Sequence, residues 1–282
     1  MIQHLLQLIW NQRKQNAWLW AELLLVSVFL WFLVDYLYVM GRTYTAPLGF
    51  DIRHTYSIVI SSLSERSPDY IPKEKRERPD GVHLLTALDR IRTYPGVESA
   101  CLTDGGVPYY MGSRNLVWRI DTLQVPCRYA FVTPEFFDVF RIYDKDGKTA
   151  SLKRAIEDNN SIVISADVET MNPGLSLLRQ KAYRGNVTDE IEETIRGISV
   201  PIRRHEYTKA EPNVYRALRL SRMEEGYYEG MIDAVRLCVR VRPDVDNADF
   251  PARFRKDMAE QLRLGNLYLL DVQPLSYIRD GY

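Results

Sequence analysis

The stretch that decides the fold is residues 231–276, MIDAVRLCVRVRPDVDNADFPARFRKDMAEQLRLGNLYLLDVQPLS. Its beginning alternates apolar and polar side chains, which is typical of a half-buried strand. An apolar stripe at helical spacing follows, and another strand-like run closes the stretch, so the sequence predicts strand, helix and strand in that order. We expect Asp246 or Asn247 to cap the helix and Gly265 to end it. The stripe consists of Phe250, Phe254, Met258 and Leu262.

The same order of elements recurs near the start of the polar part of the chain. Residues 54–63 are rich in β-branched residues and predict a strand. After a polar, proline-containing connector that predicts an exposed loop, residues 80–96 predict a helix and residues 97–104 a strand. Two such β-α-β units predict an α+β domain with its helices against one face of a sheet. The expected helix has Asp80 as its cap, Pro95 and Gly96 as its stop, and an apolar face of Val82, Leu85, Leu88 and Ile91.

Between the two units the sequence predicts an inserted part of mixed strands and helices. Thr133 is the expected cap of a helix over residues 133–140, with Pro134 as its first residue. Residues 160–169 predict a strand that leads into a helix, whereas residues 171–193 show no clear pattern. Further strands are expected at 115–121, 123–132, 194–208 and 213–221.

Ahead of this domain lies an apolar stretch, AWLWAELLLVSVFLWFLVDYLYVMG, at residues 17–41. As a helix, about 24 such residues span roughly 36 Å, enough for a hydrocarbon core about 30 Å thick. A cleaved signal peptide would be followed by a small-x-small site, and aromatic flanks are unusual for a buried core helix. The sequence therefore predicts a transmembrane helix over residues 17–40, with aromatic groups at both ends: Trp18, Trp20, Tyr36 and Tyr38.

Two carboxylates, Glu22 and Asp35, lie inside the predicted transmembrane helix, about one turn from its ends. At the centre of a bilayer each would cost about 2.5–3.5 kcal/mol on insertion scales. We therefore expect both to turn toward the headgroups or toward other membrane helices.

Flanking charge gives the expected orientation of the transmembrane helix. Arg13 and Lys14 precede the apolar stretch and Arg42 alone closely follows it, so the positive-inside rule places the N-terminus in the cytoplasm. Residues 1–16 are expected to form an amphipathic helix along the inner membrane surface, with a plain N-terminal extension as the alternative. The apolar face of that helix is Ile2, Leu5, Leu6 and Ile9.

Composition and motifs argue against several classes of function. The chain carries 37 Lys and Arg against 37 Asp and Glu, and this zero net charge argues against a nucleic-acid binder. The sequence contains no nucleophile elbow, no phosphate-binding glycine loop and no pair of histidines at metal-binding spacing. Acidic stretches at 144–148 and 244–249 lack the pattern of a calcium loop. We therefore predict no catalytic residue, no cofactor and no metal. The four histidines are His4, His54, His83 and His205.

The three cysteines lie among apolar or β-prone neighbours, and their odd number argues against a disulfide scaffold. We expect them to be buried core thiols. A bridge between Cys101 and Cys127 stays open at this point, and the third cysteine is Cys238.

The order of several segments resembles that of a known family. PLGFD follows the apolar helix, and YPGVESA lies at the turn into the second strand of the first β-α-β unit. VTPEFFDVF, NSIVISADVE and VRLCVRVRPDVDNADFPARFRKDMAEQL come next in that order. Together these segments resemble the extracytoplasmic core domain of MacB/FtsX-like ABC transporter permeases, over nearly the whole chain.

The resemblance implies a porter-like part at about residues 50–130 and 228–282, and an inserted mixed α/β part at about 131–227. It also implies a cytoplasmic ATPase partner, a second permease subunit and an outer domain that relays ATP-driven motion without moving substrate through the membrane itself. The expected role is a non-catalytic permease-like subunit of the cell inner membrane, with a periplasmic outer domain. The apolar face of residues 1–16 would then contact the ATPase.

Two features depart from the family pattern. Its permeases continue into three more membrane helices, whereas no second apolar run follows here, so we expect either a truncated product or the missing helices on another chain. Residues 171–193 replace a glycine-containing turn of the family. The alternative function is a single-pass sensor or signalling protein whose outer domain binds a ligand or partner, and a membrane-anchored enzyme ranks third.

Overall fold

The computed structural model describes residue 10 and residues 17–110, 112, 114–185, 190–229 and 232–281. They form two compact units, of which one contains the N-terminal helix together with loop residues Glu206–Thr208. The other, which we call the main unit, consists of Pro47–His205 and Lys209–Tyr282. The helix predicted over residues 1–16 lies outside the described residues except for Trp10. Its apolar face therefore stays a prediction: Ile2, Leu5, Leu6 and Ile9.

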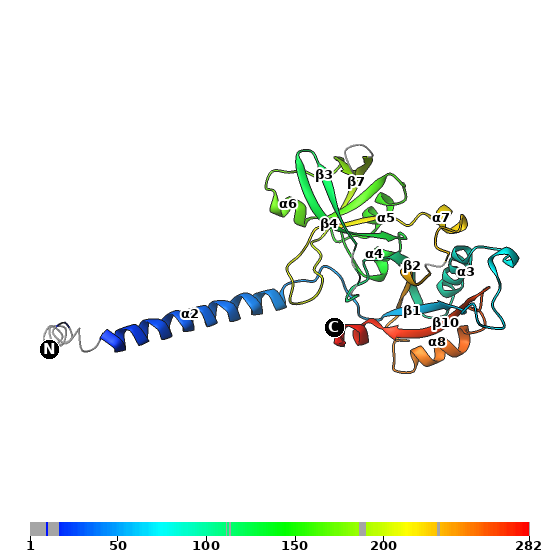
Figure 1. Ribbon diagram of the computed structural model, residues 1–282, viewed down its shortest axis with the longest axis horizontal. Coiled ribbons are helices and arrows are strands. Elements are labelled where there is room, and N and C mark those ends of the chain that lie inside the picture. The colour runs from blue at the N-terminus through cyan, green and yellow to red at the C-terminus, as the bar shows by residue number, and fades with distance from the viewer. Residues whose placement is uncertain are drawn as a thin grey trace. The chain divides into compact units, whose positions relative to one another are not determined.

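The N-terminal helix α2 spans Ala17–Thr45 and contains the predicted transmembrane segment, continuing past residue 40 (Figure 1). Its 29 residues extend over about 44 Å, more than the hydrocarbon core of a bilayer. None of its residues is buried, whereas a core helix of a globular protein would be mostly buried. Among the described residues, α2 is the one helix with the length and composition to cross a membrane. Glu22 and Asp35 are both exposed on it.

The main unit contains one sheet of ten strands, four of which belong to the two predicted β-α-β units. Their elements are β1 Thr55–Ser62, α3 Asp80–Arg92, β2 Val97–Asp104, β9 Arg236–Val241, α8 Phe250–Met258 and β10 Leu267–Pro274. The strand order is β10-β1-β9-β2, and neighbouring strands run antiparallel. Apolar residues of α3 and α8 share one hydrophobic cluster with this sheet, so both helices cover the same face. Both predicted β-α-β units are thus confirmed.

The apolar stripe predicted for α8 is confirmed, because its four side chains are all buried in that cluster. The helix itself is shorter than predicted. It begins at Phe250, directly after Asp249, and ends at Met258. Its cap residue is Asp249 and not the predicted Asp246 or Asn247, although the side chain of Asn247 accepts a hydrogen bond from the Asp249 amide (3.2 Å) just ahead of the first turn. Gly265 does not end the helix as predicted, because the last helical residue is Met258, although the φ of Gly265 is positive at +56°.

The buried face of α3 differs from the predicted one. Its core side chains are Leu84, Ala87, Leu88 and Ile91, whereas Val82 and Leu85 are only half-buried. Both sets satisfy helical spacing, and the small Ala87 carries little weight in a reading of apolar periodicity. Asp80 does not cap the helix, because it lies in the first turn and pairs with Arg76 (3.0 Å).

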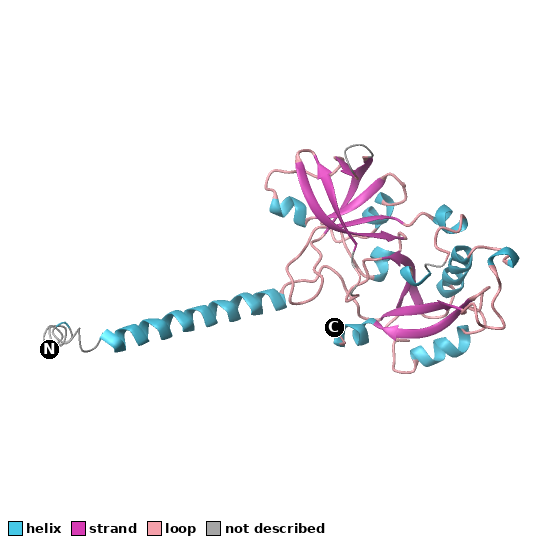
Figure 2. Ribbon diagram, in the orientation of Figure 1, coloured by secondary structure: helices cyan, strands magenta, loops and turns pink. Residues whose placement is uncertain are grey.

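The other six strands close a ring. They are β3 Arg114–Ile120, β4 Leu123–Val132, β5 Ser161–Ser165, β6 Lys181–Arg184, β7 Ile191–Ser199 and β8 Asn213–Ala217. β4 pairs with β3 on one side and in parallel with β8 on the other, so the order β4-β3-β6-β7-β5-β8 returns to β4. In Figure 2 these strands form the upper group. Alternate side chains such as Trp118 and Ile120 of β3 fill the interior of the ring.

Strand β4 also joins the ring to the four-stranded sheet, because Val132 and Phe131 lie opposite Thr103 and Asp104 of β2. By strand pairing the ring therefore begins ahead of residue 131, the predicted start of the inserted part. Contacts unite the ring and the sheet into one compact unit. The division into a porter-like and an inserted part at 131 and 227 stays a prediction.

Several elements of the middle of the chain differ from the prediction. The helix expected over 133–140 is the short α4, Phe136–Val139. Thr133 does not cap it, because its hydroxyl accepts the amide of Leu102 on β2 (3.1 Å). The strand expected over 194–208 is β7, which ends at Ser199 because Pro201 cannot donate to a ladder.

Short helices account for the remaining differences. The end of the strand expected over 213–221 is instead helix α7, Leu220–Glu224, and the end of the closing strand is helix α9, Leu275–Asp280. Helix α6, Asp167–Met171, follows β5 as predicted. The elements without a prediction are α5 Ala150–Ala155, the 3-10 helices η1 Lys73–Lys75 and η2 Ile232–Ala234, and strand β6.

Candidate functional site

The residues that follow α2 are held in the main unit by hydrogen bonds of their backbone. We call residues 47–54, between α2 and β1, the junction segment. Its hydrogen bonds reach the loop after α4, the loop after β7 and the end of β9, three places far apart in the sequence. The bonds run from the Asp51 amide to the Phe140 carbonyl (2.8 Å), from the Arg203 amide to the Leu48 carbonyl (3.0 Å) and from the Val241 amide to the His54 carbonyl (2.9 Å).

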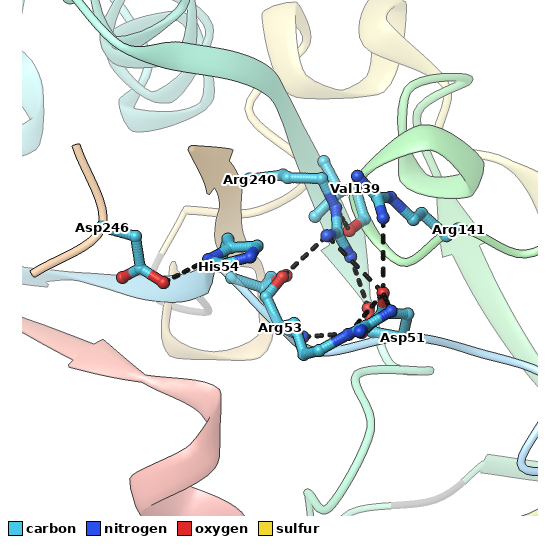
Figure 3. Close-up of polar contacts among 8 residues, drawn as sticks. Asp51, Arg53, His54, Val139, Arg141, Arg240 and Asp246 are labelled. Carbon is cyan, nitrogen blue, oxygen red and sulfur yellow. Dashed lines mark hydrogen bonds and ion pairs between the residues drawn. The ribbon is translucent and has the colours of Figure 1, made fainter. Parts of the chain in front are cut away.

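Arg240 of β9 binds the junction segment from inside the main unit (Figure 3). Its side chain is buried, and its guanidinium donates to three backbone carbonyls. Nε donates to the Val139 oxygen (2.7 Å), and the two terminal nitrogens donate to the Arg53 oxygen (2.7 Å) and the Asp51 oxygen (2.5 Å). A guanidinium offers five N–H donors in a planar fork, so a single side chain can hold several carbonyls at once. The junction segment is thereby tied to an inner strand of the four-stranded sheet.

The charge of Arg240 is balanced by the carboxylate of Asp51. One oxygen of this carboxylate lies 4.0 Å from the Arg240 guanidinium and 3.5 Å from that of Arg141. Burial lowers the pKa of Arg240, and the charge of Arg141 lowers it further, whereas Asp51 opposes both. A guanidinium stays protonated at neutral pH even so, and the fork therefore keeps all of its donors.

Asp51 is itself held by its neighbour Arg53. Its carboxylate accepts the Arg53 amide (2.8 Å), the side-chain Nε (3.1 Å) and a terminal guanidinium nitrogen (3.0 Å). Burial raises the pKa of Asp51, but the hydrogen bonds from Arg53 and the charge of Arg240 outweigh burial and hold the pKa below its usual value. The carboxylate is therefore ionised throughout the neutral range.

The lowered pKa of Asp51 predicts a pH-dependent contribution to stability. A carboxyl group with a depressed folded pKa stabilises the fold above its unfolded pKa, about 3.9, and loses this effect as the pH falls through the folded value. We expect Asp51→Asn to lower the free energy of unfolding by about 1 kcal/mol at pH 7. Urea denaturation in a series of buffers should show this difference shrink toward zero below about pH 4.

The exposed Asp244, which pairs with Arg242 at 3.3 Å, provides the control. Asp244→Asn should leave stability nearly unchanged across the same series, because exposed ion pairs contribute little. A difference between Asp51→Asn and the wild type that persists undiminished at low pH would contradict the role given to the Asp51 carboxylate.

Apolar side chains reinforce the junction segment. Phe50 and Ile52 pack against the hydrophobic cluster that contains Phe136, Phe137 and Phe140 of α4 and its flanks. Leu275 and Ile278 of α9 pack into the same cluster. The junction segment and α9, which lie at opposite ends of the main unit in sequence, thus share one core.

Gly49 lets the junction segment approach the loop after β7. Its φ is +84°, and a Cβ built there would lie 2.1 Å from the Pro201 carbonyl oxygen. Any larger residue would have to move this backbone, so glycine is required here for both conformation and space.

The histidines lie at separate places in the fold. His54 ends the junction segment with a φ of +57°, and its Nδ1 contacts the carboxylate of Asp246, which also accepts the Tyr56 hydroxyl. His83 is half-buried on α3, and burial lowers its pKa. His205 precedes the loop Glu206–Thr208, and His4 lies outside the described residues. Within the described ranges, no group of three His, Cys, Asp or Glu side chains could hold a metal ion.

The cysteines are buried free thiols, as predicted. Cys101 and Cys238 lie opposite each other on β2 and β9, and no bridge joins Cys101 to Cys127. Burial raises the pKa of Cys127 to about 12 and raises that of Cys101 as well. The thiols of Cys101 and Cys127 are therefore protonated core groups at neutral pH.

The sequence reasoning missed Arg240, the residue that organises the junction segment. The available signal was its position two residues after Cys238 on an alternating strand, which puts both side chains on one face. A charged residue on the face of a cysteine expected to be buried is a candidate for a structural bond network. Of the predicted membrane residues, Glu22 and Asp35 lie exposed on α2, and their packing against other helices stays a prediction.

Comparisons with known proteins show which known structures this fold resembles. No family model and no curated protein matches the sequence. Among solved structures, the chain is similar to a domain from Porphyromonas gingivalis that is assigned to a permease protein, with 18% identity and a TM-score of 0.52 over 81% of this chain and 92% of that one.

Two weaker similarities are to the periplasmic region of MacB from Actinobacillus actinomycetemcomitans and to the extracellular domain of the noncanonic ABC-type transporter YknZ from Gram-positive bacteria. The MacB region is 10% identical with a TM-score of 0.45, over 85% of this chain and 97% of that one. The YknZ domain is 11% identical with a TM-score of 0.42, over 76% of this chain and 100% of that one. The similarity to the domain from Porphyromonas gingivalis confirms, at the level of the fold, the predicted resemblance to a permease domain.

Proposed function

We propose that the chain is a permease-like subunit of an ABC transporter whose main unit relays motion of α2 to the space outside the membrane. The observation that carries the proposal is the fastening of the junction segment by Arg240, whose fork binds the backbone at Asp51 and Arg53. The fold shared with a permease-type domain supports the same role.

Mechanical relay requires little slack between the moving helix and the domain. Only Ala46 and Pro47 separate the end of α2 at Thr45 from Leu48, whose carbonyl is already bonded to the main unit. Proline fixes its own φ and reduces the conformations open to this connection. Beyond Leu48 the junction segment is held by hydrogen bonds, a buried guanidinium and apolar contacts. A displacement of the helix end therefore reaches the sheet without first extending a long flexible linker.

The partners follow from the same proposal. A cytoplasmic ATPase would supply the driving step and contact the face of Ile2, Leu5, Leu6 and Ile9, and a second permease subunit would complete the pair. Glu22 and Asp35 would face neighbouring membrane helices, because a carboxylate that faces lipid is costly. The flanking charges favour a cytoplasmic N-terminus and a periplasmic main unit at the inner membrane. The subunit itself is non-catalytic in this account.

Purification of the full-length chain from membranes tests the proposal. We expect the protein to stay in the membrane pellet through carbonate extraction and to co-purify with an ATPase identified by mass spectrometry. Replacing the four residues of the N-terminal apolar face with Gln or Ser should release the ATPase while the protein stays in the pellet. The matched control replaces Gln3 and Gln7, on another face of the same segment, with Ser and should leave the ATPase bound.

Two results would contradict the proposal. A soluble mature form that begins near Gly41 would show that the apolar helix is a cleaved signal. Co-purification of a kinase or an anti-sigma factor in place of an ATPase would favour the sensor alternative.

A further inference from the structure

One end of the six-stranded ring opens into a cavity of about 330 Å³, which we call the mouth pocket. Inward-facing side chains of β3, β6 and β8 line it, and residues of the α7 region lie across the opening. Ligand sites often lie in the mouths of β-barrels, and this volume falls at the lower end of their usual range. The pocket is separate from the junction segment, so a ligand site there does not depend on the proposed function.

Positive charge dominates the described lining of the mouth pocket. Five arginines line it, from three strands and the α7 region: Arg114, Arg184, Arg216, Arg219 and Arg222. Two carboxylates balance part of this charge. Asp104 pairs with Arg114 (2.7 Å), and Glu193 accepts a hydrogen bond from Arg216 Nε (2.8 Å). Five cations against two anions leave a surplus of three positive charges among these groups. Such a surplus in a partly enclosed cavity attracts an anion.

Buried donors in the same lining add a second, independent indication. The side chain of Trp118 is 0% exposed, and its indole N–H has no acceptor within the part of the chain that the structure describes. In the same described part, the Nε of Arg184, opposite Trp118 in the pairing of β3 with β6, also makes no hydrogen bond, although it lies 3.5 Å from a Glu193 oxygen in an ion pair. Buried donors normally have an acceptor. A ligand with anionic oxygens would provide one for both.

Aromatic rings give the mouth pocket an apolar wall and hold the cations in place. The Arg216 guanidinium lies 4.8 Å from the centre of the Phe131 ring, and that of Arg222 lies 5.1 Å from the centre of the Tyr227 ring. Stacking on a ring keeps a guanidinium plane oriented while leaving its edge free to donate. The wall also suits an apolar or aromatic ligand body.

From these observations we propose that the mouth pocket binds a small anionic molecule in which a phosphate or carboxylate group is attached to an apolar or aromatic body. The anionic group would accept from Trp118 and Arg184, and Arg222 would close over it from the α7 region. The body would lie against Phe131 and Tyr227.

Tryptophan fluorescence of the full-length chain tests this site. Four of the five tryptophans lie in residues 10–31, so changing these four to Phe leaves Trp118 as the only reporter. The chain, in a neutral detergent, is titrated with phenyl phosphate, with 3-phenylpropionate, with neutral benzyl alcohol and with inorganic phosphate. We expect saturable binding of at least one aromatic anion, tighter than binding of either benzyl alcohol or inorganic phosphate and weakened by salt. Comparison of the two aromatic anions tells whether the pocket prefers phosphate or carboxylate.

Variants separate this pocket from nonspecific binding. Arg222→Gln changes an exposed residue and should weaken binding about tenfold, and Arg184→Gln should do the same or more. Arg119→Gln is the matched control, because Arg119 is next to Trp118 but points outward and pairs with Glu190 (3.1 Å). It should change the Kd by less than about twofold.

Several outcomes would overturn the proposal. They are no saturable change with either aromatic anion, equal binding of benzyl alcohol, or equal weakening by Arg119→Gln and Arg222→Gln. Isothermal titration calorimetry of the unchanged chain repeats the test without the tryptophan substitutions, and absence of binding heat for both anions would count against the site in the same way.

Discussion

Arg240→Ala is expected to lower the free energy of unfolding of the main unit by about 3–5 kcal/mol. The substitution removes the donors of three buried or half-buried carbonyls and leaves the Asp51 carboxylate without its buried cation. Each unsatisfied group costs about 1–3 kcal/mol. Urea denaturation of the full-length chain, followed by labelling of the three buried thiols, measures the loss, because those thiols react only after the main unit opens.

Two further variants test whether the loss of stability comes from the three hydrogen bonds of the Arg240 guanidinium. Arg242→Ala, just past the end of the same strand, removes an exposed side chain and should cost less than about 0.5 kcal/mol. Arg240→Lys keeps the charge, but a single ammonium cannot reproduce the three-way fork, so an intermediate loss is expected. Equal stability of Arg240→Ala and Arg242→Ala would contradict the structural role of Arg240.

Gly49→Ala is expected to lower the free energy of unfolding by about 1.5–3.5 kcal/mol. The left-handed conformation at +84° alone costs a non-glycine residue about 1–2 kcal/mol. The new Cβ would also collide with the Pro201 oxygen, so the Leu48 carbonyl would lose its bond to the Arg203 amide, worth about 0.5–1.5 kcal/mol. The same denaturation and thiol-labelling experiment measures the total.

Gly147→Ala is the matched control for Gly49→Ala. Gly147 has a similar φ of +75°, and a Cβ there would meet nothing within 4 Å. Its substitution should therefore show the backbone strain alone, about 1–2 kcal/mol. If both alanine variants lost the same stability, the close approach of the junction segment to Pro201 would have no energetic weight.

Elements with a strong local pattern could be predicted from the sequence. β2 at 97–104 and β4 at 123–132 match their predicted bounds, because alternation and adjoining turn residues mark both ends. The stripe of α8 was also visible, since large apolar side chains recur at helical spacing. Two β-α-β units then follow from the order of these elements alone.

The closing of the ring could not be predicted in the same way. It depends on the parallel pairing of residues 128–132 with 213–217, which are far apart in sequence. Nothing local in either segment specifies the other as its partner, because register is chosen by the interior packing around Trp118. Strand β6 likewise has only four residues, too few for a recognisable period.

The hydrogen bonds of the junction segment could not be predicted from the sequence for a related reason. PLGFD resembles a segment of the family, but the structure of the junction segment depends on the carbonyls of residues 51, 53 and 139, which all meet the side chain of Arg240. Backbone carbonyls carry no sequence signal, so only the unusual position of Arg240 on a buried strand face pointed to it. The predicted coupling face at Ile2, Leu5, Leu6 and Ile9 lies outside the described residues and awaits experiment.

The most direct test of the central claim is amide hydrogen exchange of the full-length chain in lipid nanodiscs. If the junction segment moves with the sheet, the Asp51 amide, bonded to the Phe140 carbonyl, should exchange with nearly the same opening free energy as the amides that join β9 to β2 inside the sheet. Rapid exchange at Asp51 with continued protection between β9 and β2 would contradict the account, because the segment would then detach while the sheet stays folded.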